Sequence, residues 1–330
     1  MKQLTQNFKT GETKLIETPT PRVSKGKVLI KSHRSLVSLG TEKMLVSFGQ
    51  ASMLGKIKQQ PHRVKEVITK IKSDGIKATL NTINTKLNKP INLGYSNAGE
   101  IIAIGEGVTE FKIGDRVISN GYHAEYVAVP KNLVAKIPDN VSYNDACFTV
   151  VASIGLQGIR LINPTFGETI VVMGLGLIGL ISLQLLKANG CNVIGIDPDP
   201  DKLKIANEFG INAFSPTDMD PVKFVKSKTN DEGVDGVLIT ASAKTNDIIK
   251  QSAQMCRKRG RIVLVGAIGL SLDRADFYEK ELSFQVSCSY GPGRYVTGYE
   301  QKGLDYPIGF VRWTENRNFQ AILNLSLIHI

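Results

Sequence analysis

The sequence predicts an α/β protein in which a mostly β domain is followed by a domain with a doubly wound parallel sheet. Three observations predict this class. The first 145 residues hold short strand-like runs separated by glycines and turn residues. From about residue 146, strand and helix patterns alternate strictly, which is typical of parallel βαβ units. A length of 330 residues also favours two domains over one.

The first domain, residues 1–145, is expected to contain half-exposed strands interrupted by a helical insert. Alternating or apolar runs at 27–40, 99–105, 114–119 and 124–130 suit strands. Between them, residues 61–87 carry apolar side chains at helical spacing and predict two amphipathic helices within a basic insert, 53–90. That insert contains nine Lys or Arg against Glu66 and Asp74, so it supplies +7 of the formal net charge of +11. The rest of the chain is close to neutral.

The second domain, residues 146–290, is expected to alternate strands and helices. The predicted strands are 169–173, 192–197, 235–240 and 261–266, and the predicted helices after the first three are a segment ending at Asn189, 201–209 and 246–256. The remaining residues, 291–330, are rich in glycine and aromatics and look like neither half of the chain.

Composition excludes several classes of protein. A hydrophobic fraction of 42% and a charged fraction of 22% are those of an ordinary globular protein. The N-terminus has no apolar signal region, so the cytoplasm is the expected location. Four well-separated cysteines, with no C-x-x-C pair, argue against a zinc lobe or a disulfide framework and are expected to be buried thiols. The basic helices lack interleaved aromatics, so we expect a solvated helix face and no nucleic-acid partner.

Residues 169–186, "TIVVMGLGLIGLISLQLL", carry no charge and could be a membrane span, a buried segment or a nucleotide site. The glycines decide between these, since Gly174, Gly176 and Gly179 form G-x-G-x-x-G between a predicted strand and a predicted helix. The first glycine permits a tight turn, the second lets main chain approach a pyrophosphate, and the third lets the helix pack on the sheet. We therefore predict a dinucleotide site and no membrane span. Its loop residues are Gly174, Leu175, Gly176, Leu177, Ile178 and Gly179.

Asp197 ends the next predicted strand, eighteen residues after Gly179. A carboxylate there accepts hydrogen bonds from ribose hydroxyls and repels a 2'-phosphate, so the predicted cofactor is NAD. Later strands of the same sheet end at Thr240 and Ala241 and at Gly266 and Ala267. Because ligands bind at the carboxyl ends of parallel strands, these four residues are also predicted to contact the cofactor, with simple turn chemistry as the alternative.

The order of the two domains, with "PINLGYSNAGEIIAIGEGVTEFKIGDRV" (90–117) and "GETIVVMGLGLIG" (167–179), resembles the medium-chain dehydrogenase/reductase family, also called zinc-type alcohol dehydrogenases. The resemblance covers nearly the whole chain. It implies a GroES-like catalytic domain, a Rossmann domain and an active site in the cleft between them.

The chain departs from the metal-dependent members of that family at each ligand position. Leu39 and Tyr95 stand where the family has a cysteine and a histidine, and the third position falls near Thr149. Leucine cannot bind zinc, and tyrosine or threonine rarely does. We therefore expect neither catalytic nor structural zinc.

A closer resemblance is to the N-terminal half of bacterial bi-domain oxidoreductases of polysaccharide biosynthesis loci. It is carried by "SLGTEKML", the basic insert, "SYGPGRY" and "YPIGFVRWTENRN". This resemblance implies a role in surface-polysaccharide or nucleotide-sugar metabolism. It also implies a second oxidoreductase module as a partner, so residues 291–330 are expected to return to the first domain and to be truncated.

The resemblance also implies roles for individual side chains. Thr41 matches the proton-relay hydroxyl of the family, or else caps local backbone, and Tyr95 faces the substrate, or else packs in the core. Ser153 matches a position beside the nicotinamide ring. Tyr290 and Arg294 in "YGPGRY" are candidates for substrate binding, with a structural turn as the alternative. His33 and His123 are candidate general bases, because an unperturbed imidazole titrates near neutral pH, but as lone histidines in strand patterns they are expected to be structural.

The sequence thus predicts a zinc-independent, NAD-linked oxidoreductase acting on a sugar or nucleotide-sugar hydroxyl or carbonyl, with a homo-oligomer as a possible state. Two alternatives remain open. One is a quinone or enoyl reductase, which shares the metal-free version of the fold. The other is a cofactor-binding module without turnover that serves a larger oxidoreductase, because the chain has lost the metal ligands without an obvious replacement acid.

Overall fold

A computed structural model describes residues 1–52, 55–56, 85 and 87–326, and these residues form two compact units. The first unit holds residues 1–148, 300–304 and the chain from 323 onward, and the second holds 149–299 and 305–322. The break at Phe148 and Thr149 lies three residues after the expected one. Of the segment expected to return to the first domain, 305–322 instead belongs to the second unit. Most of the expected basic insert lies outside the described residues.

The first unit is mostly β, as predicted, and its strands form two antiparallel sheets. A three-stranded sheet has the order β2-β1-β4 and a five-stranded sheet has the order β7-β3-β5-β6-β8. The elements of this unit are β1 (Lys2–Gln6), β2 (Thr13–Glu17), β3 (Lys27–Ser35), α1 (Leu39–Gln50), β4 (Ile91–Asn92), β5 (Asn97–Ile104), β6 (Arg116–Ser119), β7 (Tyr126–Pro130), η1 (Lys131–Leu133), β8 (Val134–Lys136) and α5 (Tyr143–Ala146).

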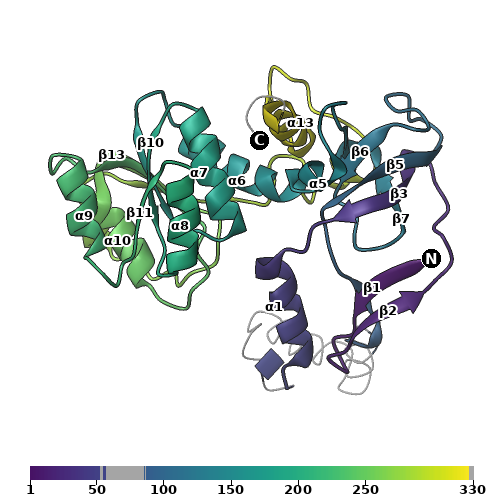
Figure 1. Ribbon diagram of the computed structural model, residues 1–330, viewed down its shortest axis with the longest axis horizontal. Helices are drawn as coiled ribbons and strands as arrows, with labels where there is room; N and C mark the ends of the chain where they lie inside the picture. Colours follow the sequence, from purple (N-terminus) through teal and green to yellow (C-terminus); the bar gives the residue numbers. More distant parts are fainter. Residues whose placement is uncertain (53–54, 57–84, 86, 327–330) are drawn as a thin grey trace, which may run out of the picture. The chain divides into compact units, whose positions relative to one another are not determined.

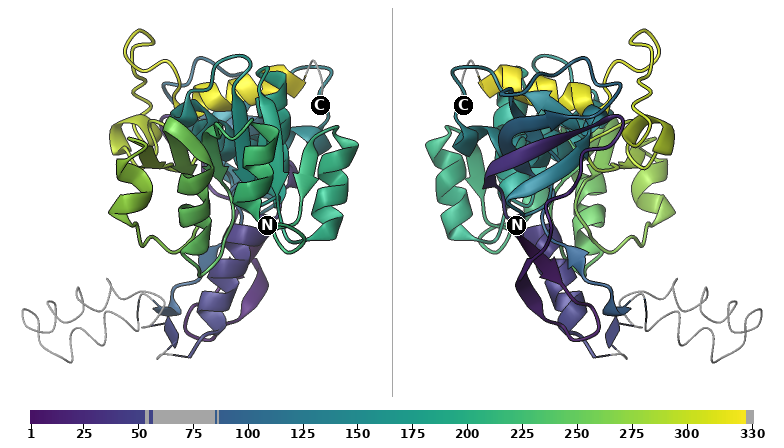
Figure 2. Two further views of the ribbon diagram at one scale, coloured as in Figure 1. Left: turned by 90° about the vertical axis from the view of Figure 1, so that its left-hand side faces the viewer. Right: turned by 90° about the vertical axis from the view of Figure 1, so that its right-hand side faces the viewer.

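Strand β3 leads from the core of this unit to helix α1. The interior-facing residues of β3, Val28 and Ile30, are fully buried, so the strand is fixed in the core before it reaches the surface at Ser35. Helix α1 follows after three residues and lies beside β1 (Figures 1 and 2). An edge-to-face contact of Phe48 with Phe8, with ring centroids 5.2 Å apart, packs the far end of the helix.

The second unit is organised around a six-stranded parallel sheet of order β11-β10-β9-β12-β13-β14. Renumbered from its first strand this is 3-2-1-4-5-6, the order of dinucleotide-binding doubly wound sheets. Its strands are β9 (Thr169–Met173), β10 (Asn192–Ile196), β11 (Asn212–Phe214), β12 (Val234–Ile239), β13 (Cys256–Leu264) and β14 (Ser283–Val286). The four predicted strands are confirmed, and β11 and β14 extend the sheet at its two edges.

Helices cover both faces of this sheet (Figure 1). Helices α6, α7 and α8 pack with one another, and α9, α10 and α11 form the other group. Val225 of α9 and Ile249 of α10 complete the core on that side together with strand residues such as Val171. The helices of this unit are α6 (Thr149–Ile162), α7 (Leu177–Ala188), α8 (Pro200–Glu208), α9 (Pro221–Lys228), α10 (Asp247–Met255) and α11 (Arg274–Tyr278). Helices α12 (Thr297–Glu300) and α13 (Glu315–Ser326) have residues in both units.

The uncharged run at 169–186 is strand β9 followed by α7. Residues 170–172 are fully buried because both faces of a central parallel strand are covered by helices. Among the described residues, no helix has the length and apolar character needed to cross a membrane.

The four cysteines differ in exposure. Cys147, Cys191 and Cys256 are buried thiols, as expected, but Cys288 is exposed, so the expectation was wrong for that residue. Cys288 follows the short edge strand β14, where nothing in the second unit covers it. Burial raises the pKa of Cys256 to about 12, against which nearby Lys280, Arg257 and Arg261 act only weakly.

We expect maleimide at pH 8 to label Cys288 in the native protein and to leave Cys256 unmodified. A thiol with this pKa is ionised to only about one part in ten thousand at pH 8. Peptide mass spectrometry of the labelled protein measures both sites. Equal labelling of Cys256 and Cys288 before unfolding would contradict the packing of β13.

Candidate functional site

The glycine-rich loop joins β9 to α7 and leaves a cradle of main chain. Gly174 has φ +96°, a backbone conformation that disfavours any side chain. Gly179 is buried against the Gly174 carbonyl, so a Cβ there would overlap main chain. Gly176 is the N-cap residue of α7, is exposed, and faces open space, because a Cβ built on it meets no atom within 4 Å. The amides at the start of α7 are therefore accessible to an anion such as a pyrophosphate.

Asp197 follows β10 and is bonded to this loop. Its Oδ2 accepts the Leu175 N–H at 2.6 Å, and its Oδ1 accepts the Asp199 N–H at 2.9 Å. The residue is 5% exposed. The Nζ atom of Lys202 lies 3.6 Å from Asp197 Oδ1 and 3.4 Å from Asp199 Oδ2. The carboxylate is thus aimed at the loop main chain, and it can meet a ribose only with the lone pairs that these bonds leave.

The other predicted cofactor residues of the sheet lie at its carboxyl edge. Thr240 and Ala241 both donate main-chain N–H groups to Met173 O at 2.9 Å, which ties the end of β12 to the end of β9. Ala267 N donates to Ala241 O at 3.0 Å. A Cβ on Gly266 would overlap the Ala241 carbonyl, so a side chain there would separate the two strand ends. These residues and the glycine loop therefore share one edge of the sheet.

Among the loop residues, Leu175 is fully buried and Leu177 is 37% exposed, whereas Ile178 is half-buried. Ser153, predicted to lie beside the nicotinamide, is fully buried in α6. Its Oγ donates to Thr149 O at 2.8 Å, one turn earlier in the same helix. Only a rotation of that hydroxyl would make it available to a ligand.

The two predicted substrate residues differ in exposure. Tyr290 is 3% exposed, and its ring packs on Phe319 with centroids 5.2 Å apart. Its carbonyl accepts a hydrogen bond from Asn318 Nδ2 at 2.9 Å. Arg294 is half-buried, with its guanidinium 4.0 Å from the ring centroid of exposed Tyr295. The placement of Tyr290 favours the structural alternative for that ring.

In the first unit, the candidate hydroxyls lie around the start of α1. Thr41 is exposed in the first turn of the helix, whose N-cap residue is Ser38, so Thr41 is not the cap. Tyr95 is half-buried and its hydroxyl donates to Ser38 Oγ at 2.8 Å. Leu39, at the first ligand position of the metal-dependent members, is 75% exposed.

Sequence reasoning did not find a hydrogen-bonded chain beside these hydroxyls. Ser35 Oγ lies 2.8 Å from His123 Nδ1, and His123 Nε2 lies 2.9 Å from Glu42 Oε2. Glu42 Oε1 accepts the Ser38 N–H at 2.8 Å. The three side chains come from β3, the loop before β7, and α1. Because Glu42 and His123 are 81 positions apart in the sequence, no local pattern could have joined them.

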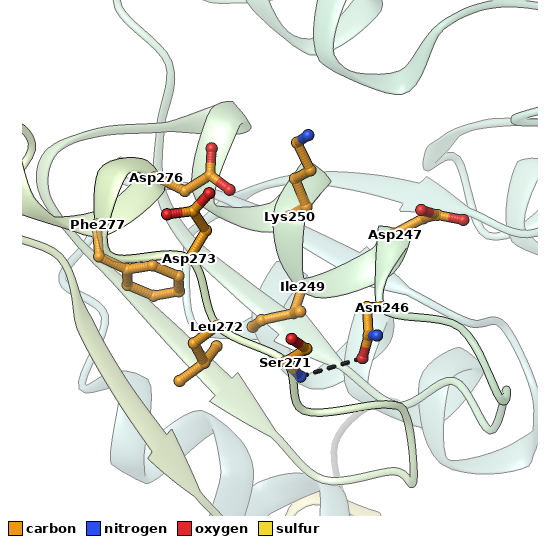
Figure 3. A pocket seen from close by; sticks show the side chains of 9 residues that line it. All are labelled: Asn246, Asp247, Ile249, Lys250, Ser271, Leu272, Asp273, Asp276 and Phe277. Carbon is orange, nitrogen blue, oxygen red and sulfur yellow. Dashed lines mark hydrogen bonds between the residues drawn. The ribbon is translucent and has the colours of Figure 1, made fainter.

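A small pocket opens between α10 and α11 (Figure 3). It has a volume of about 130 Å³, and Asp247, Asp273 and Asp276 line it together with Lys250. Ser271 N donates to Asn246 Oδ1 at 3.0 Å across its floor. Its carboxylates would repel a pyrophosphate, and it is smaller than the pockets that hold drug-sized ligands. It is therefore distinct from the dinucleotide cradle.

A parallel sheet with a glycine-rich phosphate loop and a partner unit of antiparallel β sheets define a two-domain dehydrogenase. Two family models match the chain: "Alcohol dehydrogenase GroES-like domain" over residues 63–139 and "Zinc-binding dehydrogenase" over residues 178–301. The chain belongs to the medium-chain dehydrogenase/reductase family and is an oxidoreductase. The expected fold class, with GroES-like and Rossmann parts, is confirmed.

Curated relatives include a sorbitol dehydrogenase of Bacillus subtilis (strain 168), 28% identical over 68% of this chain and 71% of its own length. A D-guloside 3-dehydrogenase of Escherichia coli (strain K12) is 30% identical over 68% of this chain and 63% of its own length. Among solved structures, galactitol-1-phosphate dehydrogenase from Escherichia coli has a TM-score of 0.74 at 18% identity, covering 99% of this chain and 89% of the other. A mycobacterial protein complexed with NADPH has a TM-score of 0.69 at 19% identity, with 99% and 88% covered.

Proposed function

We propose that this chain is a zinc-independent, NAD(H)-dependent oxidoreductase of surface-polysaccharide biosynthesis in the cytoplasm. It transfers hydride to or from a hydroxyl or carbonyl of a sugar or nucleotide sugar. The observation that carries the proposal is the open main-chain cradle at Gly176. The Asp197 carboxylate fixes this loop by accepting the Leu175 N–H. The relatives named for sorbitol and D-guloside support a polyhydroxylated substrate.

The donor set of this chain does not fit zinc. Leu39 has no donor atom, the hydroxyl of Tyr95 is engaged with Ser38, and Thr149 is 1% exposed. Within the part of the chain that the structure describes, no group of three or more His, Cys, Asp or Glu side chains could hold a metal ion. We therefore derive no step through a metal.

Bound NAD(H) would supply or accept the hydride. The residues of the chain would bind the cofactor and move the proton. The loop amides at the start of α7 hold the pyrophosphate, and the ends of β12 and β13 border the same edge. Oxidation of a hydroxyl also releases a proton, so a hydroxyl group near the reacting oxygen has to move it. Exposed Thr41 and the Tyr95 hydroxyl are the proposed groups in the first unit.

NADP(H) is a second candidate cofactor, because Lys202 is a cation near the predicted ribose site. Its ammonium lies beside Asp197 and is 38% exposed, so it could attract a 2'-phosphate. Its charge is shared, however, between Asp197 and Asp199. The net charge of this group of three is −1, which favours a ribose without phosphate.

The decisive experiment is a fluorescence titration of the purified protein with NADH and with NADPH. Metal analysis is made on the same sample, followed by an absorbance screen at 340 nm with sugar alcohols and nucleotide sugars. Tight NADH binding, no stoichiometric zinc and turnover with a sugar substrate are expected. Bound zinc, or preference for NADPH, would overturn the corresponding part of the proposal, and NADH binding without turnover would favour a non-catalytic module.

We expect Asp197→Asn to weaken NADH binding about tenfold and to narrow the difference between NADH and NADPH. The amide keeps one acceptor for Leu175 N but loses the charge that repels a 2'-phosphate and one acceptor for ribose. Titration of both cofactors measures the change. Asp199→Asn is the matched control, because asparagine caps α8 as well as aspartate does and leaves the Leu175 bond intact. Equal losses in both variants would show that only local charge matters.

A further inference from the structure

We propose that Ser35, His123 and Glu42 form a proton-transfer chain that exchanges the substrate proton during the redox reaction. The proposal rests on the proposed function and refines it: Ser35 takes the substrate proton, and the Thr41 and Tyr95 hydroxyls bind the reacting oxygen. The chain begins at an exposed hydroxyl, passes through an imidazole whose side chain is 9% exposed, and ends at a carboxylate whose side chain is 7% exposed. It therefore has one open end and one closed end.

The hydrogen bonds assign each proton. A carboxylate only accepts, so the bond of 2.9 Å between Glu42 Oε2 and His123 Nε2 requires the hydrogen on Nε2. In the neutral ring, Nδ1 is then an acceptor, and Ser35 Oγ donates to it at 2.8 Å. When Nδ1 gains a proton, Ser35 Oγ reverses and accepts. Both protonation states keep both hydrogen bonds, and exposed Ser35 gives a proton a path to and from the imidazole.

The main chain holds the imidazole in this position. His123 N donates to Leu93 O at 2.8 Å. Gly94, which follows Leu93, has φ +89°. A Cβ on Gly94 would lie 2.7 Å from His123 Cγ, so the ring packs directly on glycine main chain. The ring is thereby fixed between Ser35 and Glu42, as efficient proton transfer requires.

A structural role alone explains this arrangement poorly. Burying a histidine and a carboxylate carries a desolvation penalty that often cancels their attraction, so such a pair contributes little net stability. Helix α1 is already packed by Phe48 on Phe8. Glu42 also connects to the candidate hydroxyls, because its Oε1 accepts from Ser38 N and Ser38 Oγ accepts from Tyr95. The His123–Glu42 pair is therefore linked to Ser38, the residue that also accepts the Tyr95 hydroxyl.

The proton balance in the direction of oxidation is complete. A bound oxidised dinucleotide would accept the electron pair of the carbinol C–H bond as hydride. The substrate O–H bond breaks as its proton passes to Ser35 Oγ, and the O–H electron pair becomes the π bond of the carbonyl. Ser35 gives its own proton to His123 Nδ1, and Glu42 offsets the imidazolium charge. Water later removes the proton through Ser35, and reduction follows the reverse order.

The first test needs neither cofactor nor substrate. In protein labelled with ¹⁵N-histidine, the His123 signal is assigned by its loss in His123→Gln. We expect the neutral ring to carry its hydrogen on Nε2, and Glu42→Gln to shift the tautomer population, because an amide can donate as well as accept. A neutral ring with its hydrogen on Nδ1, or a tautomer indifferent to Glu42→Gln, would overturn the chain.

The second test separates proton transfer from folding and from cofactor binding. With the substrate found in the absorbance screen, His123→Ala is expected to lose at least 100-fold in kcat, the lower range for general acid–base catalysis, while NADH affinity is unchanged. Added imidazole is expected to restore part of the rate, which a structural histidine would not allow. Ser35→Ala should lose rate at unchanged NADH affinity.

His33→Gln serves as the control, since His33 is exposed, stacks on Tyr143 with centroids 4.6 Å apart and lies outside the chain. Full activity in His123→Ala would refute this inference and leave the proposed function intact. Absence of NADH binding and turnover in the wild type would refute the proposed function, and the tautomer measurement would still decide on the chain.

Discussion

Gly179→Ala is expected to lower the free energy of unfolding by about 1–3 kcal/mol, the usual range for overpacking of a dense core. In an ordinary helix interior, alanine would be about 1 kcal/mol more favourable than glycine, so helix propensity predicts the opposite sign. Packing decides here, because the added Cβ would overlap the Gly174 carbonyl and approach Thr240 Oγ1 to 2.9 Å. The first of these neighbours is main chain and cannot rotate away. Urea unfolding monitored by circular dichroism measures the change.

Gly176→Ala is the matched control for this prediction. It lies in the same loop with φ −67°, and its Cβ would meet no protein atom within 4 Å. Its stability should stay within about 0.5 kcal/mol of the wild type, as for other surface substitutions. Its NADH affinity, however, should fall at least tenfold, because the methyl group occupies the space through which main chain meets the pyrophosphate. If both variants lose stability alike, the division of roles between the two glycines is wrong.

The sequence predicted the elements of the second unit best where the pattern was strong and local. Strand β9 is a continuous apolar run followed by three glycines, so its identity and its neighbours in the sheet follow from one stretch of chain. Strands β11 and β14 were missed because they are edge strands of three and four residues, whose burial on one side gives little hydrophobic signal. Helix α9 was missed although Asp220 and Pro221 mark its start.

In the candidate site too, residues linked by a fixed sequence spacing were predicted and residues brought together only by the fold were missed. The glycine loop and Asp197 were predicted together because a fixed spacing links them, and the structure adds the bond from Leu175 N. His123 was expected to be structural because it is a lone histidine in a strand pattern. Its partners Ser35 and Glu42 lie 88 and 81 positions away in the sequence. Such a chain exists only after β3, α1 and the loop before β7 have packed. Long-range side-chain bonds of this kind are invisible to spacing rules.

Phe319→Ala is expected to cost about 3–5 kcal/mol of unfolding free energy, as for other buried phenylalanines truncated to alanine. Phe319 is fully buried and packs on Tyr290. Its neighbour Asn318 extends the cluster, since its Nδ2 donates to Tyr290 O and its Oδ1 accepts from Arg160 Nε at 2.7 Å. Thermal unfolding followed by circular dichroism measures the loss. Phe310→Ala is the control: its ring is 90% exposed, and it should change stability by no more than about 0.5 kcal/mol.

A separate variant, Tyr290→Phe, tests what Tyr290 does. If the ring is a packing residue, Tyr290→Phe keeps the contact with Phe319 and should leave KM for the sugar substrate within about twofold, since one lost substrate hydrogen bond would cost about 1 kcal/mol or more. A KM raised tenfold in Tyr290→Phe, with stability unchanged, would instead place its hydroxyl on the substrate. If the ring is a packing residue, the motif is a structural turn. Gly291 and Gly293 flank Pro292 with φ +119° and +106°, and this turn lets Tyr290 and Tyr299 pack in the core.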